Sequence, residues 1–169
     1  MNRKIIPAII CLSLAVACFP EIARGNEYAL YDCYDELSQR FFSLEAIKEQ
    51  FGDQAEWQER TEQSSHGDDI EIKIFVMLYP GVTIEALGFT YDNEDRFFLT
   101  ALGVDRAGYV DFLGIDIGSS RENVIKTFGE PDGIEENRLH YDDEADFTSI
   151  EFIVEDNMVA GMRLFSQVD

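Results

Sequence analysis

The chain has 169 residues, of which 34 are acidic and 13 are basic, so its formal net charge at pH 7 is −21. A charge of this sign repels nucleic-acid backbones and anionic lipid, and it favours a basic protein partner or cations. It therefore excludes nucleic-acid binding, although the need to stay soluble would explain the same charge without any partner. The length is sufficient for one domain with a hydrophobic core.

The N-terminal segment has the pattern of a secretory signal. Two basic residues near the start precede an apolar run at residues 5–19, and the small residues Ala23 and Gly25 favour cleavage after Gly25. The apolar run is shorter than the roughly 20 residues that a membrane span needs. We expect residues 1–25 to be a signal peptide. Residues 26–169, with 10 basic and 33 acidic residues and a net charge of −23, would then be periplasmic or secreted.

A second interpretation of the same segment stays open. Residues 15–18, Ala-Val-Ala-Cys, resemble a bacterial lipoprotein box, in which Cys18 would carry the lipid and tether the chain to a membrane. Cleavage after Gly25 would instead remove Cys11 and Cys18 and leave Cys33 alone, so that no internal disulfide could form. We expect Cys33 to be buried as a small hydrophobic residue.

The first half of the chain combines two helical patterns with a run of strands. Apolar residues recur at helical spacing over residues 27–42, and residues 43–52 restart the pattern with Ser43 as N-cap and Gly52 as the terminating residue. Residues 70–79 give the strongest strand signal, because two sets of side chains alternate throughout. Further strands are predicted at 82–91, after a Pro80-Gly81 turn, and at 96–102, and residues 109–115 are expected to be extended.

The second half repeats this order of elements. Ser119 and Glu122 have the spacing of a capping box, and Gly129 followed by Pro131 ends the predicted helix. Strands are predicted at residues 137–141, 147–155 and 158–165, the last two joined by a tight Asp156-Asn157 turn.

The two halves are also similar in sequence, which leads to a prediction of the fold. Four positions are identical at a constant shift of 77 residues, although such caps also arise by chance: Ser43 and Ser120, Glu45 and Glu122, Phe51 and Phe128, Gly52 and Gly129. We predict one α+β domain over residues 26–169, an antiparallel sheet of six to eight strands with short helices packed on one face. It would consist of two tandem helix-plus-strands units, at residues 43–102 and 117–165.

Residues 117–132, IGSSRENVIKTFGEPD, resemble a helix motif of cell-envelope proteins, G-x-S-x-x-x-V-I-x-x-F/L-G-x-P. The motif belongs to the beta-lactamase-inhibitor-protein-like (BLIP-like) fold, which also includes outer-membrane assembly lipoproteins of the SmpA/OmlA (BamE) type. The resemblance implies a non-enzymatic protein-binding domain in or outside the cell envelope, with inhibition as one activity and outer-envelope scaffolding by a tethered lipoprotein as the alternative. Unlike the inhibitor protein, the mature chain cannot form a disulfide, and no inhibitory residues carry over.

The sequence shows no catalytic or metal-binding motif. His66 in a polar loop and His140 in a predicted strand are accompanied by neither a nucleophile elbow nor a zinc motif. The acidic turns at residues 92–95 and 142–146 collect oxygen ligands, but neither fits a calcium-binding loop, so solvated turns are expected. We therefore predict no enzyme activity, no cofactor and no metal.

The predicted binding surface is the sheet face away from the helices. In strand 70–79 we expect the Ile, Val and Leu positions to pack on the helices, so that the alternate positions point outward with Trp57 of a preceding strand. In the final hairpin the outward side chains would be Glu151, Ile153, Glu155, Val159, Arg163 and Phe165. Aromatic and Met side chains flanked by acids suit contact with a basic protein, unless a further strand, the first helix or a second copy covers them. The predicted contact residues are Trp57, Phe75, Met77, Tyr79, Arg163 and Phe165.

Overall fold

The computed structural model describes residues 25–53, 55–63, 71–91, 94–143 and 147–167. Within these ranges the chain forms three α-helices, α1 (Gly25–Arg40), α2 (Leu44–Phe51) and α3 (Arg121–Phe128). It also forms eight β-strands: β1 (Glu56–Gln63), β2 (Glu71–Tyr79), β3 (Val82–Tyr91), β4 (Glu94–Val104), β5 (Gly133–Glu135), β6 (Arg138–Asp142), β7 (Thr148–Glu155) and β8 (Met158–Ser166). Most of the predicted signal, including Cys18, lies outside the described residues, as does His66.

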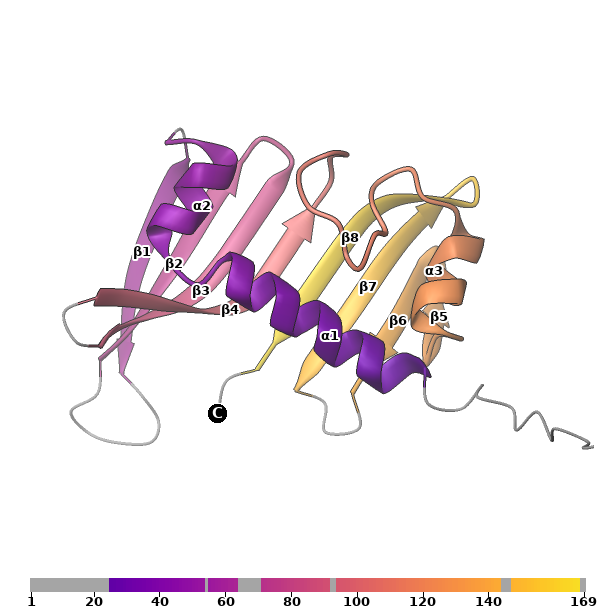
Figure 1. Ribbon diagram of the computed structural model, residues 1–169, viewed down its shortest axis with the longest axis horizontal. Coiled ribbons are helices and arrows are strands. Elements are labelled where there is room, and N and C mark those ends of the chain that lie inside the picture. Colours follow the sequence, from indigo (N-terminus) through magenta and orange to yellow (C-terminus); the bar gives the residue numbers. More distant parts are fainter. Residues whose placement is uncertain (1–24, 54, 64–70, 92–93, 144–146, 168–169) are drawn as a thin grey trace, which may run out of the picture.

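The eight described strands form one sheet in which every neighbouring pair is antiparallel. The strand order is β1-β2-β3-β4-β8-β7-β6-β5, so β4 and β8 meet in the middle. The three helices lie on the same face, and α1 crosses the sheet obliquely from the β6–β7 region towards β4 (Figure 1). The predicted α+β fold with an antiparallel sheet is confirmed. In the described part of the chain, no helix combines the length and the apolar character that crossing a membrane requires.

Local capping signals set the ends of α2 and α3. The Ser43 hydroxyl accepts a hydrogen bond of 3.2 Å from the backbone N–H three residues later, and Ser120 does the same, also at 3.2 Å. Both helices end at a glycine in the left-handed region, Gly52 at φ +85° and Gly129 at φ +84°. The N-cap of α3 is therefore Ser120 and not Ser119, because the Ser119 hydroxyl accepts its hydrogen bond from a residue before the helix.

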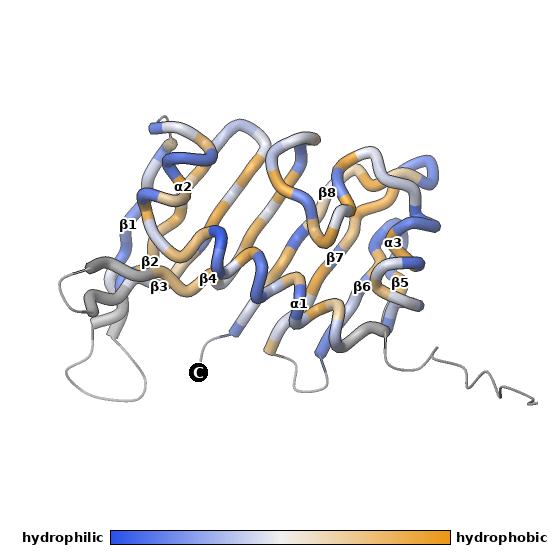
Figure 2. Tube along the Cα trace, viewed as in Figure 1, coloured by the Kyte–Doolittle hydropathy of each residue, from blue (hydrophilic) through white to orange (hydrophobic). Residues whose placement is uncertain are grey.

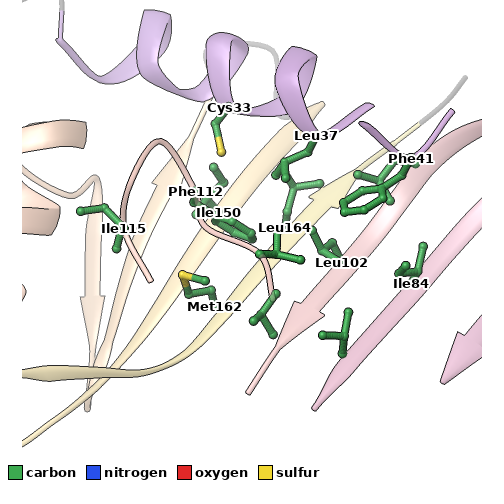
Figure 3. Close-up of a cluster of buried hydrophobic side chains, with 14 of the residues drawn as sticks. Cys33, Leu37, Phe41, Ile84, Leu102, Phe112, Ile115, Ile150, Met162 and Leu164 are labelled. Atoms are coloured by element: carbon green, nitrogen blue, oxygen red, sulfur yellow. The ribbon is translucent and has the colours of Figure 1, made fainter. Parts of the chain in front are cut away.

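The core lies between α1 and the middle of the sheet. Cys33 and Leu37 project from α1 onto the strands, Phe41 follows the end of the helix, and Cys33 is buried as predicted (Figure 3). Burying one such large apolar side chain contributes roughly 1.5–3 kcal/mol. Apolar residues line the strands beneath the helices (Figure 2). The strand residues of this cluster include Ile84, Leu102, Ile150, Met162 and Leu164.

The segment between β4 and α3 differs from its prediction. The expectation that residues 109–115 are extended is wrong, because Phe112 and Ile115 exchange two backbone hydrogen bonds, of 2.8 and 3.1 Å, that close a turn. Leu113 and Gly114 occupy the turn with φ of +52° and +81°. Phe112 and Ile115 are buried, so this segment folds back onto the core instead of adding a strand.

Two β-bulges interrupt the side-chain alternation in β4 and β8. The pairing of β3 with β4 leaves Thr100 as an extra residue, and the pairing of β7 with β8 leaves Ala160 as one. An extra residue reverses the face that the side chains beyond it occupy. This explains why Val159, expected to point outward, is buried on the helix side.

Candidate functional site

Strand β2 is apolar on both faces, and its orientation is the reverse of the predicted one. Phe75, Met77 and Tyr79 lie beneath the helices, with Met77 fully buried and Tyr79 8% exposed. Phe51 of α2 packs on the Tyr79 ring at 5.0 Å between centroids, and burial together with nearby Asp53 raises the pKa of the Tyr79 hydroxyl. The alternation of side chains along β2 could not by itself show which set faces the helices, because both sets are apolar. The contact of Tyr79 with Phe51 of α2 identifies the set that does. The helix-free face therefore carries Ile74, Val76 and Leu78.

Trp57 also lies on the helix side, because it pairs directly with Met77. The Trp57 and Phe75 rings meet edge-on at 6.4 Å, and Phe75 contacts Phe97 at 5.1 Å. Of the six predicted contact residues, Arg163 and Phe165 lie on the helix-free face, whereas Trp57, Phe75, Met77 and Tyr79 do not. The structure thus does not bring the six together.

Apolar side chains from four strands lie on the helix-free face, and we call them the apolar strip. Ile74 lies opposite Leu87, and Leu87 lies opposite Phe98. Ala101 lies opposite Phe165, which carries the strip from β4 into β8. The strip consists of Ile74, Val76, Leu78, Leu87, Phe98 and Phe165. Its exposed members are Phe98 (48%) and Phe165 (44%), whereas Ile74 is 6% exposed, and Glu85 lies opposite Val76 on the same face. An exposed apolar patch on a folded protein marks an interaction surface.

The sequence analysis singled out neither Leu87 nor Phe98, and it placed the β2 members of the strip in the core. The sequence did contain a signal for this surface, because both sets of alternating side chains over residues 74–79 are apolar. In an antiparallel sheet that helices cover on one face, one of the two sets is expected to be polar.

The other half of the helix-free face is polar. Glu151 accepts a hydrogen bond from Arg138 Nη1 at 3.1 Å, and its second oxygen lies 3.3 Å from His140 Nδ1. Arg163 Nη2 donates to Asp105 Oδ1 at 2.7 Å. Partly exposed pairs of this kind add little stability, but they hold charged groups in fixed positions on the surface. We call these five residues the polar ladder.

A groove of about 460 Å³ opens beside Phe98, below the short stretch over which β4 pairs with β8. Phe98 lines the groove and also belongs to the apolar strip. We call this groove the aromatic groove. Its described lining comprises Tyr31, Tyr34 and Asp35 of α1, Phe98 of β4, Asp143, Phe147 and Thr148 around the β6–β7 turn, and Ser166 and Gln167 at the end of β8.

The site offers little for catalysis or metal binding. Among the residues that the structure describes, no three His, Cys, Asp or Glu side chains are grouped to hold a metal ion. His140 and Glu151 form a histidine–carboxylate pair, but they lie on a strand surface and do not line the groove. In the acidic turn after β6, the buried Asp143 carboxylate accepts hydrogen bonds from the backbone N–H groups of Phe147 (2.8 Å) and Thr148 (3.0 Å). Asp143 therefore shapes the turn.

Comparison of the chain with known protein families, with curated proteins and with solved structures gives no match. The function is therefore argued from the apolar strip, the polar ladder and the aromatic groove.

Proposed function

We propose that this chain is an exported, non-enzymatic module that binds a protein partner through the helix-free face of its sheet. The apolar strip is the observation that carries this proposal. An antiparallel sheet covered by helices on one face normally presents polar side chains on the other. Here the helices already cover one apolar face, so the second apolar set lies outside the helix-side core, and its exposed members Phe98 and Phe165 are available to a partner.

The strip and the polar ladder together have the composition of a protein interface. Large, half-exposed aromatic side chains such as Phe98 and Phe165 supply most of the binding energy when a partner desolvates them. The ladder beside them provides polar groups that fix orientation, as the rim of an interface does. Covering a functional surface of the partner would make the module an inhibitor of that partner.

The charge of the chain favours a basic partner. Residues 26–169 carry a net charge of −23, which would accelerate encounter with a positively charged protein. Added salt screens this attraction over about 10 Å at 0.1 M. We therefore expect the association rate to fall as the salt concentration rises, whereas the contribution of the apolar contacts to the binding free energy should change little.

We further propose that β1–β4 and β5–β8 are tandem units of the BLIP-like type. Each set of strands runs in sequence order from one edge of the sheet to its centre, and each follows a helix with a serine N-cap and a terminal glycine. The bulged residues, Thr100 and Ala160, both lie in the fourth strand of their unit. The shared capping and the shared bulge support a duplicated unit.

The register of the sheet adds independent support for this duplication. Gly103 and Arg163 face each other at the centre, and each bulge precedes its central residue by three positions. The residues in register with this pair form one row across the sheet, which we call the central row. Rotation by 180° about the Gly103–Arg163 pair superposes the two halves of this row. The row reads Glu56, Leu78, Thr83 and Gly103 from one edge, and Gly133, His140, Glu151 and Arg163 from the other. Glu56 and Gly133 differ by the same 77 residues that relate the helices.

Export is proposed on the N-terminal pattern, in which two basic residues are followed by an apolar run and by the small residues Ala23 and Gly25. Mass spectrometry of the mature N-terminus tests the assignment. A free Asn26 supports the soluble exported form, and a lipidated Cys18 supports the tethered one.

Partner capture from secreted and periplasmic fractions tests the binding face. Phe165→Glu places a charge in the apolar strip, and we expect it to lower recovery of the specific partner about tenfold or more, since truncation of an interface anchor commonly costs at least 1.4 kcal/mol. Ile134→Glu is the matched control, because Ile134 is 57% exposed and lies opposite Leu139 on the helix side. Equal recovery with both variants, at unchanged circular dichroism, would contradict the proposal.

A further inference from the structure

The aromatic groove gives the proposed partner a chemical identity, and this inference rests on the proposed function. We propose that the groove receives an arginine side chain of the bound protein. Phe98 is shared by the groove and the apolar strip, so a partner that covers Phe98 would lie beside the groove.

The walls of the groove are held in place by hydrogen bonds. The Tyr34 hydroxyl donates to the Leu99 carbonyl at 3.3 Å, which attaches this side of α1 to β4. The Gln167 N–H donates to the Phe147 carbonyl at 2.8 Å, which attaches the end of β8 to the β6–β7 turn. The shape of the groove is therefore set before a ligand enters, and less ordering entropy is lost on binding.

The charge of the groove selects a cation. Its described lining contains no Lys, Arg or His, and of its two carboxylates that of Asp143 is buried and accepts two backbone hydrogen bonds, whereas that of Asp35 faces solvent. Asp35 is exposed and makes no hydrogen bond or ion pair with another described residue. An anion would be repelled by these groups and by the net charge of the whole chain.

The aromatic lining favours a guanidinium over an ammonium group. Tyr31, Phe98 and Phe147 are all between 42% and 48% exposed, so their rings are accessible from the groove. A guanidinium group stacks on aromatic faces, is weakly hydrated and binds a carboxylate through two parallel hydrogen bonds. Lysine offers a compact, strongly hydrated charge that uses this lining less well. Because the walls are half-exposed, the groove suits a side chain from a partner surface better than a fully enclosed small molecule.

Nuclear magnetic resonance titration with a minimal probe tests the assignment. N-acetyl-arginine N-methylamide is added to the 15N-labelled protein and compared with the citrulline analogue, which has nearly the same shape and no charge. We expect shifts at the amides of Tyr31, Phe147 and Gln167, with the arginine probe binding about fivefold more tightly. Equal affinities for the two probes, or shifts confined to other residues, would overturn the inference.

Two matched pairs of variants locate the interaction. Asp35→Asn removes the groove carboxylate and should weaken probe binding about three- to tenfold. Asp32→Asn removes the same charge from the same helix outside the groove, and it should leave binding unchanged. Tyr31→Ala should weaken binding, whereas Tyr28→Ala, an exposed residue that does not line the groove, should not. Equal effects within either pair would count against the groove.

A third probe, ethylguanidinium, tests whether the guanidinium group is the part that the groove recognises. It should bind with an affinity close to that of the arginine probe, and no binding would show that the groove does not recognise a guanidinium group. The proposed function is tested separately by the effect of Phe165→Glu on partner capture. Loss of partner capture with no probe binding would retain the binding face and reject the groove. Probe binding with partner capture insensitive to Phe165→Glu would reject the binding face.

Discussion

The thiol of Cys33 shows how burial of a single residue makes stability depend on pH. Cys33 lies between α1 and the core, and burial raises the pKa of its thiol, with smaller contributions from Glu36 and Asp111. The folded protein therefore keeps the thiol proton at a pH where the unfolded chain releases it. Because the unfolded state binds fewer protons there, the free energy of unfolding falls as pH rises above about 9.

We predict that replacing Cys33 reduces this alkaline loss of stability. Urea unfolding of the wild type and of Cys33→Ala is measured from about pH 7 to pH 10. The wild-type free energy of unfolding should fall more steeply above pH 9 than that of the variant, whatever the offset between the two at pH 7. Tyr141, whose pKa burial also raises, contributes to both proteins equally. Parallel curves would contradict the assignment.

Predictions for single residues were confirmed where the conformation depends only on residues that are adjacent in sequence. Three such features are the N-cap at Ser43, the terminal glycines of α2 and α3, and the Asp156-Asn157 turn with φ of +50° and +64°. Each is determined by a few consecutive residues, so the sequence is sufficient to predict it. Val159 was misplaced because a bulge lies between it and the rest of β8. The glycine inside this strand, Gly161, was the signal for a bulge, and the alternation pattern did not take it into account.

At the scale of elements, the cluster of aromatic rings across β1–β4 depends on one missing side chain. The Phe75 ring lies against Gly88 of β3, where an added Cβ would stand 2.2 Å from Phe75 Cε2. The same ring contacts Trp57 and Phe97, so it has neighbours on both sides. A methyl group at residue 88 would therefore displace a ring that cannot move freely.

We predict that Gly88→Ala lowers the free energy of unfolding by about 1–3 kcal/mol, as overpacking of a core does. Urea unfolding gives the value. Gly133→Ala is the control, since its Cβ would make an ordinary contact of 3.7 Å with His140 Cβ and should change stability by about 0.5 kcal/mol or less. A loss from Gly88→Ala no larger than that of the control would show that the ring moves aside.

Elements with strong periodicity or clear caps were predicted, and weakly patterned ones were not. β5 has three residues, too few for an alternation signal, and β1 is a run of polar and charged residues around Trp57. The orientation of β2 could not be derived because both of its faces are apolar, and only the contact of Tyr79 with Phe51 of α2 distinguishes them. The aromatic groove collects residues from α1, β4, the β6–β7 turn and the end of β8, which no single window of sequence brings together.

For the whole molecule, the excess of acidic residues acts against the compact state. The chain has 34 acidic and only 13 basic residues, so most carboxylates have no basic residue available to pair with. The ion pairs that the structure describes are partly exposed, such as Lys73 with Glu59 at 3.5 Å. Like charges held on one folded surface repel each other more than they do in an expanded chain. Screening should therefore stabilise the fold.

We predict that the melting temperature rises by about 2–4 °C between about 10 mM and 200 mM NaCl, corresponding to relief of about 1 kcal/mol of repulsion. Differential scanning calorimetry gives the measurement. Choline chloride at the same ionic strength should give a similar rise, because screening does not depend on the cation. A melting temperature that falls with salt would show that attractive pairs dominate.

The path of α1 across the sheet sets an order of events for a chain that emerges from the ribosome N-terminus first. This helix packs on β6 and β7, which follow it by roughly a hundred residues. Its apolar side stays uncovered until nearly all of the polypeptide has emerged, so folding in stages during synthesis is disfavoured. A product truncated before β7 would leave the apolar side of α1 without this strand, and proteases would degrade it readily.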